Sequence, residues 1–148
     1  MNQFEYRIQC AIFDHHQTAY PFVKFVYVPN ASKDASTGYF NKKMGLHPGA
    51  HDIHCYWNRT AIDAKPAYIR VGIFEVKSPD GKLTTQQNRY ASEMHQIGAY
   101  TGWGYSVAAY HKALKSWGLV PVHNAIKEPD LRTDEEKKRD AFDLYSPR

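Results

Sequence analysis

The sequence is poor in cysteine and contains no long apolar run. Its two cysteines, Cys10 and Cys55, favour unpaired thiols in a reducing compartment over a disulfide framework. No apolar stretch approaches the roughly 18 residues of a membrane-spanning helix, so no membrane partner is expected. The segment from Met1 to Cys10 contains Glu5 and Arg7 and lacks the apolar centre of a secretory signal. We therefore expect an intracellular protein, cytoplasmic or otherwise.

The residues that are present have the composition of one soluble globular domain. The chain has 148 residues, of which 43% are hydrophobic and 23% are charged. That length suffices for one compact core and is too short for two domains. A formal net charge of +4 is compatible with an anionic partner but does not identify one.

The periodicity of apolar residues predicts an α/β protein. Helical spacing predicts a helix over 3–17, which Asn2 and Glu5 would open with a capping box. Runs rich in β-branched and aromatic residues predict three strands, at 22–28, 52–57 and 68–77. The remaining predicted elements are a helix over 83–97, a fourth strand over 103–110 and a short helix over 111–117. This order, αβββαβ, implies a mixed sheet of about four strands flanked by helices.

Two further segments stand out by composition. Residues 29–49 form a long polar connection, and connections of that length in a compact domain are usually functional or mobile. Residues 123–148 are dense in both signs of charge and poor in large apolar side chains. We therefore predict one domain over 1–122, followed over 123–148 by a charged C-terminal tail that is a solvated helix or disordered.

The run Glu75-Val76-Lys77 carries the clearest chemical signal. Side chains alternate along a strand, so Glu75 and Lys77 should point the same way while Val76 points to the opposite face. Asp52 begins a short apolar run of its own earlier in the chain. Two carboxylates and one ammonium that converge on a point can hold a divalent cation and balance the charge of a phosphate.

Further motifs accompany this triplet. They are Glu5 and Gln9 in the first helix, Val28-Pro29-Asn30, the run 42–49 ahead of Asp52, the run 74–83, Gln87 and Gly98. On this ordered set, residues 3–110 resemble the VRR-NUC (virus-type replication-repair nuclease) branch of the PD-(D/E)XK nuclease superfamily. The resemblance implies a restriction-endonuclease-like core. The sequence departs from the family at His51, where the family usually has proline.

The resemblance also implies an activity. It indicates an Mg²⁺- or Mn²⁺-dependent, structure-selective DNA endonuclease of the Holliday-junction resolvase type, acting as a homodimer on branched DNA. The expected setting is DNA replication or repair, in the cytoplasm of a bacterium or of a phage-infected cell. The alternatives are a nicking or flap endonuclease and a nucleic-acid-binding protein that keeps the fold without turnover.

The residues suit phosphodiester hydrolysis. Asp52 and Glu75 offer the hard oxygen ligands that Mg²⁺ and Mn²⁺ prefer, and the resemblance adds the backbone carbonyl of Val76. Lys77 can orient the attacking water and offset charge that develops in the transition state. From the two helices, Glu5 is expected as an outer ligand or water-positioning group, and Gln87 as a group that orients Lys77 or the water.

Several of these residues also have a plainer interpretation. Glu5 and Gln87 both stand where a capping box places them, so each can be a helix cap alone or a cap with a second role. Three lysines are expected to contact the DNA backbone, although each can be an ordinary solvated side chain: Lys42, Lys43 and Lys82. A zinc site at His47, His51, His54 and Cys55 is disfavoured, because strand alternation would separate His54 from Cys55. His15 and His16 are expected at the surface.

Overall fold

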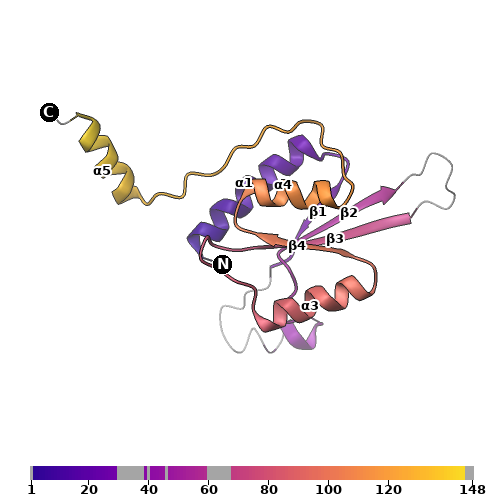
Figure 1. The fold of residues 1–148 in the computed structure, drawn as a ribbon. Coiled ribbons are helices and arrows are strands. Elements are labelled where there is room, and N and C mark those ends of the chain that lie inside the picture. The colour runs from indigo at the N-terminus through magenta and orange to yellow at the C-terminus, as the bar shows by residue number, and fades with distance from the viewer. Residues whose placement is uncertain (1, 30–38, 40, 46, 60–67, 146–148) are drawn as a thin grey trace.

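The computed structural model describes residues 2–29, 39, 41–45, 47–59 and 68–145. The elements are α1 (Gln3–Ala19), β1 (Lys24–Tyr27), β2 (Ile53–Arg59), β3 (Tyr68–Val76), α3 (Thr85–Gln96), β4 (Tyr100–Gly104), α4 (Val107–Ser116) and α5 (Asp134–Tyr145). The predicted α/β class, with helix, three strands, helix and strand in that order, is confirmed (Figure 1). None of the helices in the described part of the chain is long and apolar enough to cross a membrane.

The four strands form one mixed sheet in the order β1-β2-β3-β4. The first three strands pair antiparallel, whereas β4 runs parallel to β3. A parallel neighbour requires a crossover, and α3 supplies it between β3 and β4. Figure 1 shows α1 and α4 on one face of the sheet and α3 on the other. The sheet is therefore covered on both faces by helices.

Each covered face has its own apolar core. The larger core lies between the sheet and the α1–α4 pair and contains Ile8, Phe74, Val76 and Tyr110 among its buried members. The smaller core lies beneath α3 and joins Ala50, Ile73 and Tyr90. Because residues of β3 contribute to both cores, this strand is the central support of the domain.

The two histidines of α1 are buried, so the expectation that they lie at the surface is wrong. His15 and His16 are only 7% and 3% exposed. The Nε2 atom of His15 lies 2.9 Å from Nδ1 of His111, and His16 Nδ1 lies 2.7 Å from the Tyr110 hydroxyl. The local sequence shows only that these side chains are polar. In the fold, hydrogen bonds to α4 satisfy both imidazoles, so they can be buried.

The predicted boundary between the last strand and the last helix is also wrong. The strand expected over 103–110 lies earlier, at Tyr100–Gly104, and α4 begins at Val107. Ser106 fixes that start, because its side chain accepts a hydrogen bond from the Ala109 N–H. The first strand is shorter than predicted and spans Lys24–Tyr27.

The segment that follows α4 packs back onto the domain. The Val122 N–H donates to the Ala19 carbonyl over 2.8 Å. The Glu128 carboxylate accepts hydrogen bonds from the N–H groups of Val107 and Ala108, over 2.9 and 2.7 Å. A carboxylate at this position caps the N-terminus of α4 and complements its dipole.

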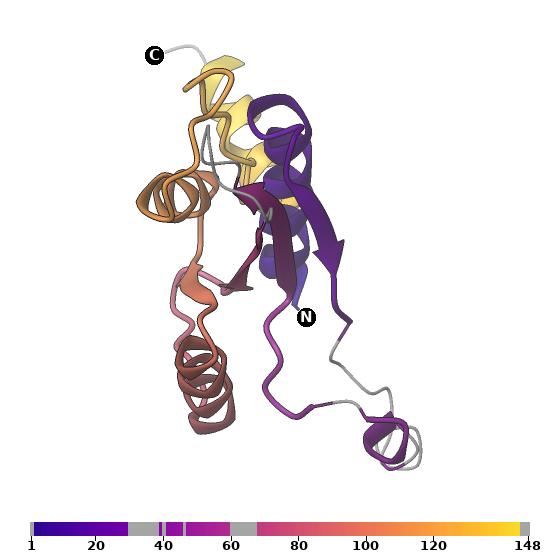
Figure 2. The same cartoon turned by 90° about the vertical axis from the view of Figure 1, so that its right-hand side faces the viewer.

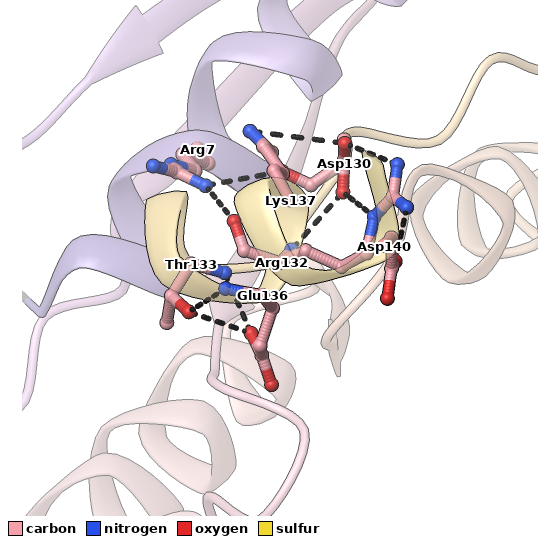
Figure 3. Close-up of polar contacts among 7 residues, drawn as sticks. All are labelled: Arg7, Asp130, Arg132, Thr133, Glu136, Lys137 and Asp140. Carbon is pink, nitrogen blue, oxygen red and sulfur yellow. Dashed lines mark hydrogen bonds and ion pairs between the residues drawn. The ribbon is translucent and has the colours of Figure 1, made fainter. Parts of the chain in front are cut away.

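Farther along, Arg7 of α1 holds the approach to the last helix. Its guanidinium donates to the carbonyls of Asp130 and Arg132, over 3.2 and 3.0 Å (Figure 3). Arg132 in turn pairs with the carboxylates of Asp130 and Asp140. Part of the predicted tail, residues 123–148, is therefore attached to α1 and α4. The helix α5 is the predicted solvated helix, and its side chains over 134–140 are largely exposed.

Candidate active site

The candidate site lies where β3 ends beside the start of β2. The antiparallel register pairs Ile53 with Phe74, which places Asp52 opposite Glu75. The Val76 N–H donates to Asp52 Oδ2 over 3.0 Å. The Val76 side chain is 1% exposed and belongs to the larger core, on the opposite face from Glu75. The alternation predicted for the Glu75-Val76-Lys77 run is thus present.

Glu75 is the centre of the site. It is 3% exposed, and its Oε1 atom lies 2.9 Å from the Lys77 ammonium and also accepts a hydrogen bond from the Gln87 amide. Its Oε2 atom is buried and has no hydrogen-bond partner within the described ranges. Nδ1 of His51, itself 1% exposed, approaches that oxygen to 3.7 Å. One oxygen of Glu75 is therefore held by protein donors, while the other is buried beside His51 without a hydrogen-bond donor among the described residues.

The electrostatics of the site favour a bound cation. Burial and, after it, the neighbouring Asp52 carboxylate raise the pKa of Glu75 to about 7, even though Lys77 acts to lower that pKa. Burial likewise raises the pKa of Asp52, although the Val76 hydrogen bond and Lys77 oppose the change. Two partly desolvated carboxylates share one ammonium here. A cation placed between them would favour the ionised form of both.

The donor set fits a hard divalent cation. Asp52 and Glu75 supply oxygen, and the unpartnered Oε2 of Glu75 is a buried acceptor that a cation would satisfy. No group of three His, Cys, Asp or Glu side chains suited to a metal occurs among the residues that the structure describes. Mg²⁺ commonly uses only one or two carboxylates and completes its shell with water and phosphate oxygens. The two carboxylates therefore fit Mg²⁺ or Mn²⁺ better than a metal that needs a protein-only cage.

Glu5 does more than cap its helix. Its Oε2 atom accepts the Asn2 N–H over 3.1 Å, and its own N–H donates to the Asn2 side chain over 2.9 Å. Its Oε1 atom accepts the Ser78 N–H over 3.3 Å, directly after Lys77 in the chain. Its charge also acts to raise the pKa of Asp52. The predicted cap is therefore real, and the same carboxylate lies beside the candidate site.

Gln87 also combines the two interpretations. Its Oε1 atom accepts the Thr84 N–H over 2.9 Å, and its N–H donates to the Thr84 hydroxyl over 3.2 Å, which together form a capping box. Its amide nitrogen donates to Glu75. A glutamine satisfies both partners because it carries an acceptor and a donor on one side chain.

The sequence places Gly49 in the motif run 42–49 ahead of Asp52, but it does not indicate that Tyr90 belongs to this site. Gly49 has φ +85°, and a Cβ there would lie 2.5 Å from the backbone of Gln86 at the start of α3. The Tyr90 ring lies 5.7 Å from the ring of His51. The turn before Asp52 can therefore approach α3 closely only because glycine occupies position 49.

The histidines of this region gather around an aromatic ring. Tyr90 is surrounded by His47, His51 and His54, with ring centroids 4.9, 5.7 and 6.3 Å from its own. Cys55 points to the other face of the sheet, where its sulfur lies 3.3 Å from the Tyr110 hydroxyl. The separation of His54 from Cys55 that alternation predicts is thus present.

The predicted DNA-contacting lysines are exposed but are not part of this cluster. Lys42 and Lys43 lie in a helical turn that projects away from the sheet (Figure 2). The ammonium of Lys43 lies 4.9 Å from the centroid of the Tyr39 ring. Lys82 is exposed ahead of α3. Within the described residues, no hydrogen bond or ion pair connects these lysines to Asp52 or Glu75, so their role remains a prediction.

Comparison of the chain with protein-family models, with curated proteins and with solved structures finds no match.

Proposed function

We propose that this protein is a metal-dependent, structure-selective DNA endonuclease that hydrolyses phosphodiester bonds, as the resemblance to VRR-NUC nucleases implies. The observation that carries the proposal is the convergence of Asp52, Glu75 and Lys77. These residues come from the start of β2 and from the end of β3 and its continuation, yet they form one cluster, in which Glu75 and Lys77 are buried and Asp52 is half-buried. Buried carboxylates with a perturbed pKa beside a single ammonium are typical of sites that perform chemistry.

The roles follow from the contacts. Asp52 and Glu75 would hold Mg²⁺ or Mn²⁺, with the Val76 carbonyl as a further ligand. When bound, such an ion lowers the pKa of its water and polarises the phosphoryl oxygens. Lys77 lies 2.9 Å from Glu75 Oε1, from where its charge can orient the attacking water and stabilise the charge that develops on the phosphate.

Branched DNA and a homodimer form the finer part of the proposal. The described residues contain one such cluster on one four-stranded sheet. Cutting both strands of a four-way junction requires two sites, which a pair of identical chains would supply. A resolvase-type role in DNA replication or repair, inside a cell, is therefore the specific function that we propose.

Cleavage of labelled DNA tests the proposal. Four-way junction, flap and plain duplex DNA are incubated with Mg²⁺ or Mn²⁺ and with the wild type, Lys77→Ala or Lys112→Ala. Lys112 is an exposed lysine of α4 and serves as the matched control. We expect metal-dependent cutting that Lys77→Ala lowers by about 10²-fold or more and that Lys112→Ala leaves unchanged. Symmetric paired cuts on the junction identify a resolvase, whereas single nicks or flap removal identify the alternatives.

A non-catalytic DNA-binding protein is the second candidate. The observation that favours it is the double engagement of Glu75 Oε1 by Lys77 and Gln87, because such a polar cluster can persist for structural reasons alone. This candidate would be established, and the nuclease excluded, if the protein binds junction DNA in a gel shift but does not cut it in the presence of Mg²⁺ or Mn²⁺.

A further inference from the structure

A cavity lies at the opposite end of the sheet from Asp52 and Glu75. It has a volume of about 430 Å³ and opens where α4 ends over β2 and β3. The residues of its wall that matter here are Trp57, Asn58, Arg70, Tyr100, Ser116 and Trp117. None of the described residues that line it is acidic. Its chemistry is therefore aromatic and cationic.

Three rings form an aromatic platform in this cavity: Trp57, Tyr100 and Trp117. The planes of the two indoles differ by 1°, and the tyrosine ring is tilted by 27° from each. The three ring centroids are 5.7 to 6.1 Å apart. Trp57 and Tyr100 are half-buried, and both line the cavity. Nearly parallel rings that remain partly accessible can receive a planar ligand by stacking.

A glycine in β3 makes room for the platform. A Cβ at Gly72 would lie 2.4 Å from Cζ3 of Trp117, so only glycine lets this indole lie against the strand. Gly72 is two positions after Arg70, and the antiparallel register places Arg70 opposite Trp57. The arginine and the aromatic platform therefore belong to the same face of the sheet.

Arg70 brings a guanidinium group to this cavity. Its Nε atom is buried, and neither a hydrogen-bond acceptor nor an ion-pair partner for it occurs within the part of the chain that the structure describes. A buried N–H of a charged group is costly when it lacks an acceptor. Guanidinium groups pair well with phosphate, because their planar donors match its oxygens two at a time. An anionic group bound in the cavity would satisfy Arg70.

We infer that this cavity binds a nucleotide, whose base stacks on the aromatic platform and whose phosphate pairs with Arg70. A planar aromatic group joined to a phosphate matches both halves of the cavity. This cavity is distinct from the candidate active site. Arg70 precedes Glu75 by five residues along β3, which corresponds to about 17 Å, and the two side chains lie on opposite faces of the sheet. The inference therefore does not depend on the proposed nuclease activity.

Tryptophan fluorescence tests this inference directly. The chain has three tryptophans, and Trp103 lies outside the cavity with 45% of its surface exposed. In the full-length Trp103→Phe protein, Trp57 and Trp117 of the platform are the only tryptophan reporters. The protein is titrated with thymidine monophosphate, thymidine, inorganic phosphate and a short oligothymidylate. EDTA is present throughout, so that neither metal binding nor cleavage at the candidate active site contributes.

We expect saturable quenching by the monophosphate, weaker binding of thymidine and no response to phosphate alone. Arg70→Gln should weaken binding of the monophosphate by about tenfold or more, because it removes the charged donor. Tyr100→Leu should weaken it to a similar degree, about tenfold, because it removes one stacking surface. Arg139→Gln, which alters an exposed arginine of α5, is the matched control and should bind like the parent protein.

The two nucleotide probes separate the possible sources of the ligand. Binding of thymidine monophosphate identifies a site for a free nucleotide. If the oligothymidylate binds and the monophosphate does not, the cavity is a site for a nucleotide within or at the end of a strand. Either result supports the inference. The inference is overturned if neither probe gives saturable quenching in a protein whose circular dichroism is that of the folded parent. It is also overturned if a folded Arg70→Gln variant binds as tightly as its parent.

Discussion

The Val76 N–H donates a hydrogen bond to Asp52 Oδ2 over 3.0 Å and so ties the end of β3 to the turn before β2. The same contact orients the Asp52 carboxylate beside Glu75. It also offsets part of the penalty for burying that carboxylate, because hydrogen bonds from backbone N–H groups favour the ionised form. Asp52 therefore has a structural role that is separable from the chemical role proposed for it.

Two substitutions of Asp52 should separate these roles. Asp52→Asn keeps an oxygen that can accept the Val76 N–H, but it removes the charge. We expect little change in the free energy of unfolding and a loss of cleavage of about 10²-fold or more. Asp52→Ala should lose cleavage equally and should also destabilise the protein by about 1–3 kcal/mol, because the Val76 N–H is left unpaired. Urea unfolding and junction cleavage measure the two effects. Wild-type cleavage by Asp52→Asn would remove Asp52 from the proposed site.

Gln87 and Thr84 offer a similar separation at the start of α3. Thr84→Ala removes the capping hydroxyl and leaves the contact from Gln87 to Glu75 in place. It should cost about 1 kcal/mol of stability and leave cleavage intact. Gln87→Glu keeps an acceptor for the Thr84 N–H but sets a second carboxylate against Glu75. We expect Gln87→Glu to lower the rate of cleavage clearly while changing the free energy of unfolding little. If thermal unfolding and cleavage assays instead show that Gln87→Glu keeps full activity, Gln87 is only a helix cap.

Local signals in the sequence predicted the parts of the structure that local interactions determine. Asn2 with Glu5 and Thr84 with Gln87 are capping pairs three residues apart, and both form as predicted. Alternation along β3 likewise predicted that Glu75 and Val76 face opposite sides. The prediction that Asp52 lies beside Glu75 came from the motif spacing of the resembled family, since periodicity does not give strand register.

Two of the wrong predictions have different causes, one a contact between distant parts of the chain and the other a local helix cap. His16 is buried because Tyr110, 94 residues later, lies against it. The run from Val107 to Tyr110 is apolar enough for a strand, but the cap at Ser106 makes it helical. No local pattern indicates that Arg7 binds carbonyl groups more than 120 residues farther along the chain.

The C-terminal segment gives a prediction about stability. Truncation after Val122 removes Glu128, which caps the N-terminus of α4. It also removes Asn124, whose side-chain oxygen is the hydrogen-bond partner of Nε2 of the buried His111. We expect the free energy of unfolding to fall by about 2 kcal/mol or more, because a helix cap and a buried hydrogen bond are lost. Truncation after Thr133 removes α5, whose ion pairs from Lys137 and Asp140 are exposed to solvent. We expect this truncation to change the free energy of unfolding little.

Thermal unfolding of the two truncated proteins tests this expectation, and Glu128→Ala supplies a point variant. That variant should reproduce part of the loss, about 1 kcal/mol, because it removes the cap alone. Equal melting temperatures for the full chain and the protein ending at Val122 would show that these contacts contribute nothing to the fold. Such a result would also support a boundary of the predicted domain at residue 122.

His15 should make the protein less stable in acid. Burial, followed by the neighbouring charges of His111, His123 and His16, lowers the pKa of His15 to about 4. In the unfolded chain the same imidazole titrates near its ordinary pKa of about 6.5. Between these two values the unfolded state binds a proton that the folded state does not. The contribution of His15 to stability is therefore complete above pH 6.5 and is lost as the pH falls toward 4.

The comparison of His15→Gln with the wild type isolates this contribution, because the other titrating groups are common to both proteins. The glutamine variant should be less stable at pH 7, since the hydrogen bond between His15 and His111 is altered. Its free energy of unfolding should nevertheless fall less between pH 6.5 and pH 4, since it has no imidazole to protonate. Urea unfolding at several pH values gives both profiles. Parallel profiles across that window would mean that the folded protein holds His15 protonated, in which case the His15–His111 contact is an imidazolium–imidazole hydrogen bond.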